Sequence, residues 1–226
     1  MLRTETDLGR FFIFIALTFS INTGFCLAAS PVKELSTSEL KKIQSSFQKI
    51  KHLSVNYTQS FYNPFRKTTR KFEGTAQFSA PNKFLWNRKK PKELIYYDGK
   101  DLIIYNPVDR VASRFSALGS KAQEVSRLAK IILNPNKFLD TYAVQSSLLD
   151  EKSKTLSLEL QPKQKNDLDH ISVVLDLKAL YLQKLSLFYR DGKIMNYVFS
   201  NPERKNIDQS IYKFDKPKGV KLVVFD

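Results

Sequence analysis

Hydrophobic and polar residues alternate along most of this chain, a pattern typical of β-strands with one apolar face. The clearest alternation covers residues 74–86, which also hold the only tryptophan. Further along, Asp98-Gly99 separates two apolar runs at residues 94–97 and 102–105, which is the strongest hairpin signal in the sequence. The pattern therefore predicts a large antiparallel sheet.

A first block of strands is expected to start near residue 53. After Asn63-Pro64 we expect a hairpin tip, followed by a returning strand over residues 72–78. The tip is expected to hold the basic residues Arg66, Lys67, Arg70 and Lys71. Further strands carry Phe84 with Trp86, and residues 110–115.

A second block of strands resumes near residue 142, and its last strands are expected at residues 212–214 and 220–225. In total we expect about ten or eleven strands at intervals of 8–12 residues, which is typical of a barrel or a highly curved sheet. The expected fold is mainly β with some α structure.

Two segments have a helical period instead. Ser36 and Glu39 have the spacing of a capping box, and the apolar residues that follow predict an amphipathic helix ending near Lys51 that covers a sheet. A second helical segment over residues 120–133 is ended by Asn134-Pro135, and a short helix is expected at 136–142. The apolar positions of the 120–133 segment are Val125, Leu128, Ala129, Ile132 and Leu133.

The first 29 residues are expected to be a signal peptide, leaving one domain over residues 30–226. A charged start precedes an apolar run at residues 11–21, and Ala28, Ala29 and Ser30 supply small residues for cleavage. The only cysteine, Cys26, lies in this segment, so the mature protein is expected to form neither a disulfide nor a thiolate metal site.

The formal net charge of the chain is +15, which favours anionic partners such as nucleic acid, lipid headgroups or an acidic protein surface. For an exported protein, membranes and acidic proteins are favoured over nucleic acid. A basic run at residues 88–92 beside Trp86 and Tyr96 is similar to a platform for single-stranded nucleic acid. We favour the simpler interpretation, a solvated loop between two strands.

Candidate catalytic residues are few. His52 and His170 are the only histidines, no Gly-x-Ser-x-Gly motif is present, and the paired aspartates lie in predicted turns. No enzyme activity, metal site or cofactor is expected.

In this context the sequence resembles the LolA family of periplasmic lipoprotein carriers. Each motif alone is weak, but their order and spacing match over most of the mature chain. The matching residues are Tyr57-Thr-Gln59, Gly74, Pro81, Phe84, Trp86, Pro91, Asp98-Gly-Lys100, Tyr105-Asn-Pro107, Leu158-Glu-Leu-Gln-Pro162-Lys163, Asp191-Gly192, Tyr212-Lys-Phe214 and Pro217-Lys-Gly219-Val220.

The resemblance implies an unclosed antiparallel β-barrel with a helical lid. It also implies a monomeric periplasmic chaperone that takes acylated lipoproteins from an inner-membrane ABC transporter (LolCDE-like) and passes them to an outer-membrane acceptor (LolB-like). Phe84 occupies the aromatic position that matters for loading. Ala80 stands where the family commonly has an arginine that latches the lid, and alanine cannot donate those hydrogen bonds.

This function assigns candidate residues to two sites. Phe84, Arg88, Lys89 and Lys90 are candidate partner contacts. The candidate residues of a lipid-binding cavity are Tyr57, Phe78, Phe84, Trp86, Tyr96, Leu128 and Ile132. A one-residue error in strand register would reverse the face that these strand residues occupy. A LolA-like protein for another lipid or glycolipid, or a LolB-like acceptor, remains an alternative.

Overall fold

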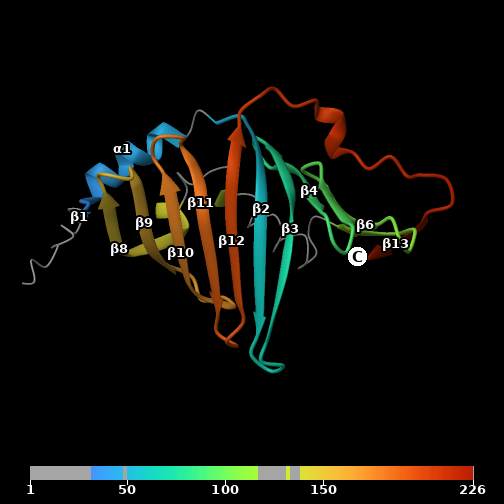
Figure 1. The fold of residues 1–226 in the computed structure, drawn as a ribbon, viewed down its shortest axis with the longest axis horizontal. Coiled ribbons are helices and arrows are strands. Elements are labelled where there is room, and N and C mark those ends of the chain that lie inside the picture. Colours follow the sequence, from blue (N-terminus) through green and yellow to red (C-terminus); the bar gives the residue numbers. More distant parts are fainter. Residues whose placement is uncertain (1–31, 48–49, 117–130, 133–137, 226) are drawn as a thin grey trace, which may run out of the picture.

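One sheet of thirteen strands forms the body of the protein in this computed structural model, which describes residues 32–47, 50–116, 131–132 and 138–225. The strand order is β1-β8-β9-β10-β11-β12-β2-β3-β4-β5-β6-β7-β13 (Figure 1). The half that begins with β1 comprises β1 (Val32–Glu34), β8 (Tyr142–Asp150), β9 (Thr155–Pro162), β10 (Leu168–Asp176), β11 (Tyr181–Tyr189) and β12 (Ile194–Glu203). The other half comprises β2 (His52–Asn63), β3 (Thr68–Ser79), β4 (Lys83–Arg88), β5 (Glu93–Tyr97), β6 (Asp101–Asn106), β7 (Val111–Ser116) and β13 (Lys221–Phe225).

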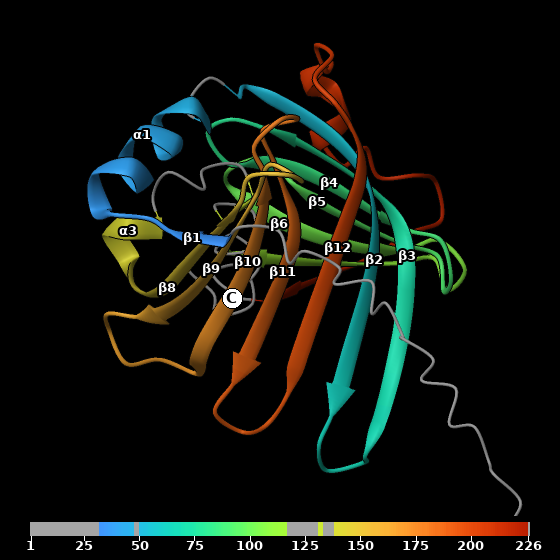
Figure 2. The same ribbon diagram turned by 60° about the vertical axis from the view of Figure 1, so that its left-hand side comes forward.

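The sheet is unclosed, as predicted. Its order ends at β1 and β13, and the two sequence blocks meet where β12 pairs with β2. All neighbours are antiparallel except β13, which runs parallel to β7. Figure 2 shows how the sheet curls, so that β4, β5 and β6 lie across the interior from β9, β10 and β11. We call the inner side the concave face and the outer side the convex face.

Helix α1 (Thr37–Phe47) begins with the predicted capping box. The Ser36 amide donates to Glu39 Oε2 at 2.9 Å, and the Glu39 amide donates to Ser36 Oγ at 3.4 Å. Leu40 and Phe47 then reach the hydrophobic core, so the helix packs through its apolar stripe. The described helix runs as far as Phe47, a few residues short of the predicted end near Lys51.

Several strand predictions were wrong in detail. Arg70 and Lys71 lie within β3 and not in a hairpin tip, because β2 and β3 stay paired as far as Asn63 and Thr68. The three-residue strand β1 was missed, since so short a segment shows no period. No strand forms at the expected residues 212–214. Tyr212 is instead the last residue of a 3₁₀ helix, η2 (Gln209–Tyr212), at whose start Ser210 N donates to Asp208 Oδ1 at 3.0 Å.

The helical insert is described only in part. Ile131 and Ile132 have helical backbone and are buried, and the short helix α3 (Phe138–Thr141) falls within the range predicted for it. The rest of the 120–133 prediction, including Leu128, lies outside the described residues, as does the predicted signal peptide. In the part of the chain that is described, no helix is both long and apolar enough to span a membrane.

Candidate functional site

The concave face carries a cluster of buried aromatic rings centred on Trp86. The Trp86 ring centroid lies 4.4 Å from that of Tyr57 and 5.9 Å from that of Phe78, the latter pair edge to face. Phe84, two residues before Trp86 on β4, stacks on Tyr97 of the neighbouring strand β5, with ring centroids 5.3 Å apart. All five side chains are buried, so together they form one apolar surface.

Strand register explains why these residues meet. Residues paired across neighbouring strands point to the same face of a sheet. Phe78 pairs with Phe84, and Phe84 pairs with Tyr97, so these three rings form one row across the sheet.

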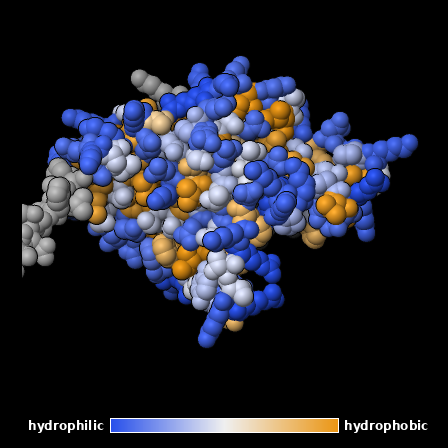
Figure 3. All heavy atoms as spheres, in the orientation of Figure 1, coloured by the Kyte–Doolittle hydropathy of each residue, from blue (hydrophilic) through white to orange (hydrophobic). Residues whose placement is uncertain are grey.

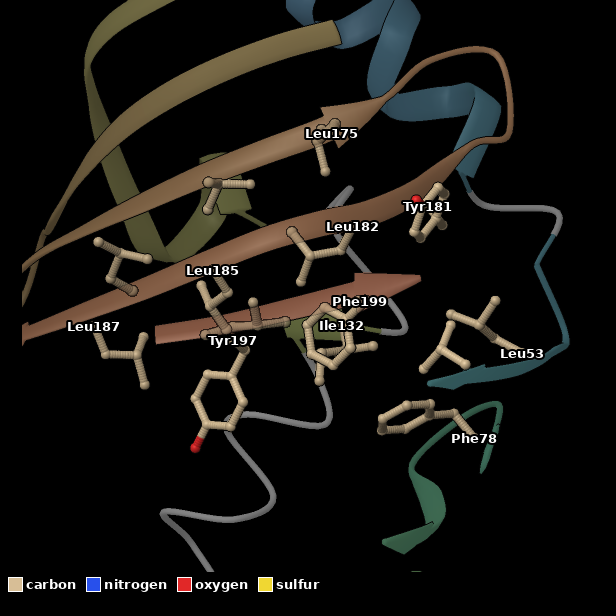
Figure 4. Close-up of a cluster of buried hydrophobic side chains, with 14 of the residues drawn as sticks. Leu53, Phe78, Ile132, Leu175, Tyr181, Leu182, Leu185, Leu187, Tyr197 and Phe199 are labelled. Carbon is tan, nitrogen blue, oxygen red and sulfur yellow. The ribbon is translucent and has the colours of Figure 1, made fainter. Parts of the chain in front are cut away.

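The other half of the concave face is rich in leucine. Figure 4 shows Leu185, Leu187, Tyr197 and Phe199 projecting to one side of β11 and β12, with Ile132 of the insert close to them. All of these side chains belong to the same buried cluster as the aromatic rings. The concave face is therefore apolar across both halves of the sheet.

The structure brings together most of the cavity residues predicted from sequence. Tyr57, Phe78, Phe84 and Trp86 share the concave face, and Ile132 packs in the same cluster. Tyr96 does not belong there, because it pairs with Leu85 and lies on the convex face against Phe214, with ring centroids 5.4 Å apart.

Tyr97 takes the place that sequence analysis gave to Tyr96. The two tyrosines are adjacent in the sequence and alternate faces, so the choice between them depends on the register of β5 against β4. The turn between those strands holds no Asn-Gly or Asp-Gly signal that would have fixed this register.

A polar pair, Arg88 and Glu93, lies at the border of the apolar surface, beside Tyr57. Arg88 Nη1 lies 3.0 Å from Glu93 Oε1, and the Arg88 guanidinium lies 4.3 Å from the centroid of the Phe72 ring. The Arg88 and Glu93 side chains are 19% and 27% exposed, so the pair lies at the border of the buried cluster. Burial raises the pKa of the Tyr57 hydroxyl, and the nearby Trp86 and Arg88 act in the opposite sense.

The other predicted partner contacts lie elsewhere. Lys89 Nζ is 3.7 Å from Glu73 Oε1, both side chains being largely exposed, and Lys90 is exposed in the turn between β4 and β5. Phe84 is only 1% exposed, so a partner cannot reach it in this arrangement of the chain.

The convex face has a small core of its own. Ser79 Oγ, which is fully buried, lies 2.7 Å from the Tyr212 hydroxyl and 2.8 Å from His52 Nδ1. Phe214 contacts Tyr105 as well as Tyr96, with the Phe214 and Tyr105 ring centroids 5.2 Å apart. The segment after β12 is thereby fixed to the outside of the sheet.

The surface of the protein is mostly polar in the orientation of Figure 1. Figure 3 shows that hydrophilic residues predominate on the side facing the viewer.

Some hollows lined by described residues lie away from the aromatic cluster. One, of about 350 Å³, lies on the convex face beside Tyr96 and Phe214, and another, of about 500 Å³, lies between residues 140–142 and 162–166. Within the described ranges, no three His, Cys, Asp or Glu side chains come close enough to hold a metal ion.

Comparison with known proteins agrees with this architecture. The profile of the family described as "Outer membrane lipoprotein carrier protein LolA" matches residues 48–215. The outer-membrane lipoprotein carrier protein of Pasteurella multocida (strain Pm70) is 26% identical over 183 residues, covering 80% of this chain and 84% of the relative. That of Glaesserella parasuis serovar 5 (strain SH0165) is 28% identical over 214 residues, covering 92% of each chain.

A solved structure shows the same fold. An uncharacterized conserved protein from Thermus thermophilus superposes with a TM-score of 0.54 at 7% identity, covering 84% of this chain and all of that one.

Proposed function

Because the chain belongs to the LolA family of outer-membrane lipoprotein carrier proteins, we propose that it carries acylated lipoproteins through the periplasm. The family is a non-enzymatic transport family, and its cargo is lipoprotein. The observation that supports this role most directly is the continuous apolar concave face of an unclosed sheet.

The physical requirement is to keep acyl chains out of water. Each CH₂ group transferred from water into apolar surroundings contributes roughly 0.8 kcal/mol, so free acyl chains do not cross an aqueous compartment unaided. The concave face is buried in this structure. In our proposal the acyl chains replace the side chains that now cover it, and the two free edges of the sheet let it adapt.

The test is binding of a fluorescent acylated peptide to the purified protein without nucleotide. We expect saturable binding, and no binding of the same peptide without its acyl chains. Failure to bind the acylated peptide would refute the carrier role. The proposed loading role of Phe84 is tested by measuring lipoprotein transfer from an inner-membrane transporter to a Phe84→Leu variant. This variant keeps an apolar side chain in the core.

We further propose that Lys89 and Lys90 contact an acidic surface of the transporter or the acceptor, because both are exposed in one turn. Charge reversal of both to glutamate should slow transfer without changing lipid affinity. The matched control reverses Lys152 and Lys178, lysines in other turns. Equal transfer by both double variants would refute this contact.

A further inference from the structure

Arg88 and Glu93 lie where the concave face changes from buried to accessible. Along β4, Phe84 is 1% and Trp86 is 6% exposed, and Arg88 follows two residues later on the same face with its side chain 19% exposed. On β2, Tyr57 is 2% exposed, and Gln59, the next residue on that face, is only partly buried. The pair thus marks one border of the apolar surface.

Two hydrogen-bond donors at this border have no acceptor. The Tyr57 hydroxyl and Arg88 Nε are both buried, and neither has a hydrogen-bond partner of normal geometry within the described part of the chain. The side chains of Trp86 and Arg88 can only donate towards the Tyr57 oxygen, so the Tyr57 O–H proton is left without an acceptor. Buried donors are nearly always paired, since a donor removed from water without an acceptor destabilises the fold. An unpaired phenol and an unpaired guanidinium nitrogen beside each other indicate a place for an acceptor from outside the chain.

The charge at the border restricts the kind of acceptor. Glu93 lies 3.0 Å from Arg88 Nη1 and balances its positive charge. A phosphate or a free carboxylate would therefore meet an already neutralised cation next to a carboxylate, which disfavours a second anion. A neutral carbonyl oxygen accepts hydrogen bonds without adding charge.

From these contacts we infer that the Tyr57 hydroxyl and Arg88 Nε bind an acyl carbonyl oxygen of the cargo, the ester carbonyl oxygen at the head of its acyl chains. This inference rests on the proposed carrier function and names the part of the lipid that the site recognises. The tail would then extend along the apolar rows from Arg88 towards Phe84. Four residues of strand provide roughly 13 Å of apolar surface in that direction.

The experiment compares two synthetic lipopeptides that differ only in the linkage of their chains. One carries ester-linked diacylglyceryl cysteine, and the other is the ether-linked analogue, which has no ester carbonyl. Tyr57→Phe keeps the ring contact with Trp86 and removes only the hydroxyl. We expect this variant to bind the ester lipopeptide about fivefold more weakly than the unchanged protein does. It should bind the ether analogue with the same affinity as the unchanged protein.

Tyr96→Phe is the matched control, because it removes a tyrosine hydroxyl from the convex face. It should bind both lipopeptides like the unchanged protein. A second variant, Arg88→Met with Glu93→Met, removes the pair together so that no unpaired charge remains, and it should also lose the preference for the ester. The infrared C=O stretch of the bound ester should shift back towards its unbonded frequency in both site variants.

The outcomes separate the inference from the function it rests on. If neither lipopeptide binds the unchanged protein, the carrier function fails and the inference fails with it. If both bind and Tyr57→Phe weakens neither, or weakens both equally, the carrier function stands and the carbonyl site is refuted. If Tyr57→Phe binds a phosphatidylglycerol probe more weakly but binds the lipopeptides as the unchanged protein does, the assignment of the site to the cargo is overturned.

Discussion

The ring of Tyr57 occupies the space that a side chain at Gly74 would need. A Cβ built on Gly74 would lie 2.8 Å from Tyr57 Cε1 and 2.0 Å from the carbonyl oxygen of Asn87. The two residues pair directly across β2 and β3, and the missing side chain lets the Tyr57 ring reach Trp86.

Gly74→Ala should therefore destabilise the protein by about 3 kcal/mol, since an added methyl group must displace either the ring or the backbone. Urea unfolding measures the loss. Thr75→Ala, at the adjacent exposed position, is the control and should change stability much less. A Gly74→Ala variant as stable as the unchanged protein would contradict the close approach.

Phe84→Ala should cost about 4 kcal/mol of folding stability, because the ring is 1% exposed and its removal leaves a cavity in the aromatic cluster. Phe65→Ala is the matched control. That phenylalanine is 83% exposed, and its loss should cost no more than about 0.5 kcal/mol. Equal unfolding midpoints for the two variants would show that Phe84 is not packed as described.

Ser79 and Tyr212 should be energetically coupled, because their hydroxyl oxygens lie 2.7 Å apart in a buried site. A double-mutant cycle of Ser79→Ala and Tyr212→Phe should give a coupling energy of about 1 kcal/mol. Strictly additive effects would mean that this hydrogen bond does not fix the segment after β12 to the sheet.

Protonation of the Glu39 carboxylate should lower the stability of the protein in acid. Hydrogen bonds with Lys33 first, and then with Ser36, lower the pKa of this carboxyl from 4.5 to about 2. A lowered carboxyl pKa stabilises the fold above the ordinary value, and this contribution is lost as the pH falls from about 4.5 towards 2. The Glu39 side chain is 37% exposed and faces water, so the effect should be small.

Urea unfolding between about pH 5 and pH 2 tests this dependence. Glu39→Gln should remove part of the decline in stability over that range, whereas Glu159→Gln in β9 should leave it unchanged. If Glu39→Gln declines as steeply as the unchanged protein, the capping-box carboxylate does not contribute in this way.

Local signals in the sequence predicted much of the fold. The turn at Asp98-Gly99 forms as expected, with Gly99 at a φ of 99° and Asp98 Oδ1 accepting from the Lys100 and Asp101 amides. The capping box at Ser36 and Glu39 also forms. These features need only residues a few positions apart, so the chain specifies them without its tertiary contacts.

The order of the strands needed the structure. The pairing of β12 with β2 and the parallel pairing of β13 with β7 join segments far apart in the sequence, and no local pattern encodes either. The segment containing Tyr212 was read as a strand, yet it packs on the convex face through Ser79 and His52. Tertiary contacts decided its conformation.

The sequence by itself determined a large, mainly antiparallel sheet and most of the aromatic residues that meet on its concave face. It did so because alternation with a period of two fixes which residues share a side of one strand. Only the tertiary structure decided that Tyr97 and not Tyr96 belongs to that face, and that Arg88 turns inward to Glu93. Both depend on how one strand is set against its neighbour, and a shift of one residue exchanges the two sides of the sheet.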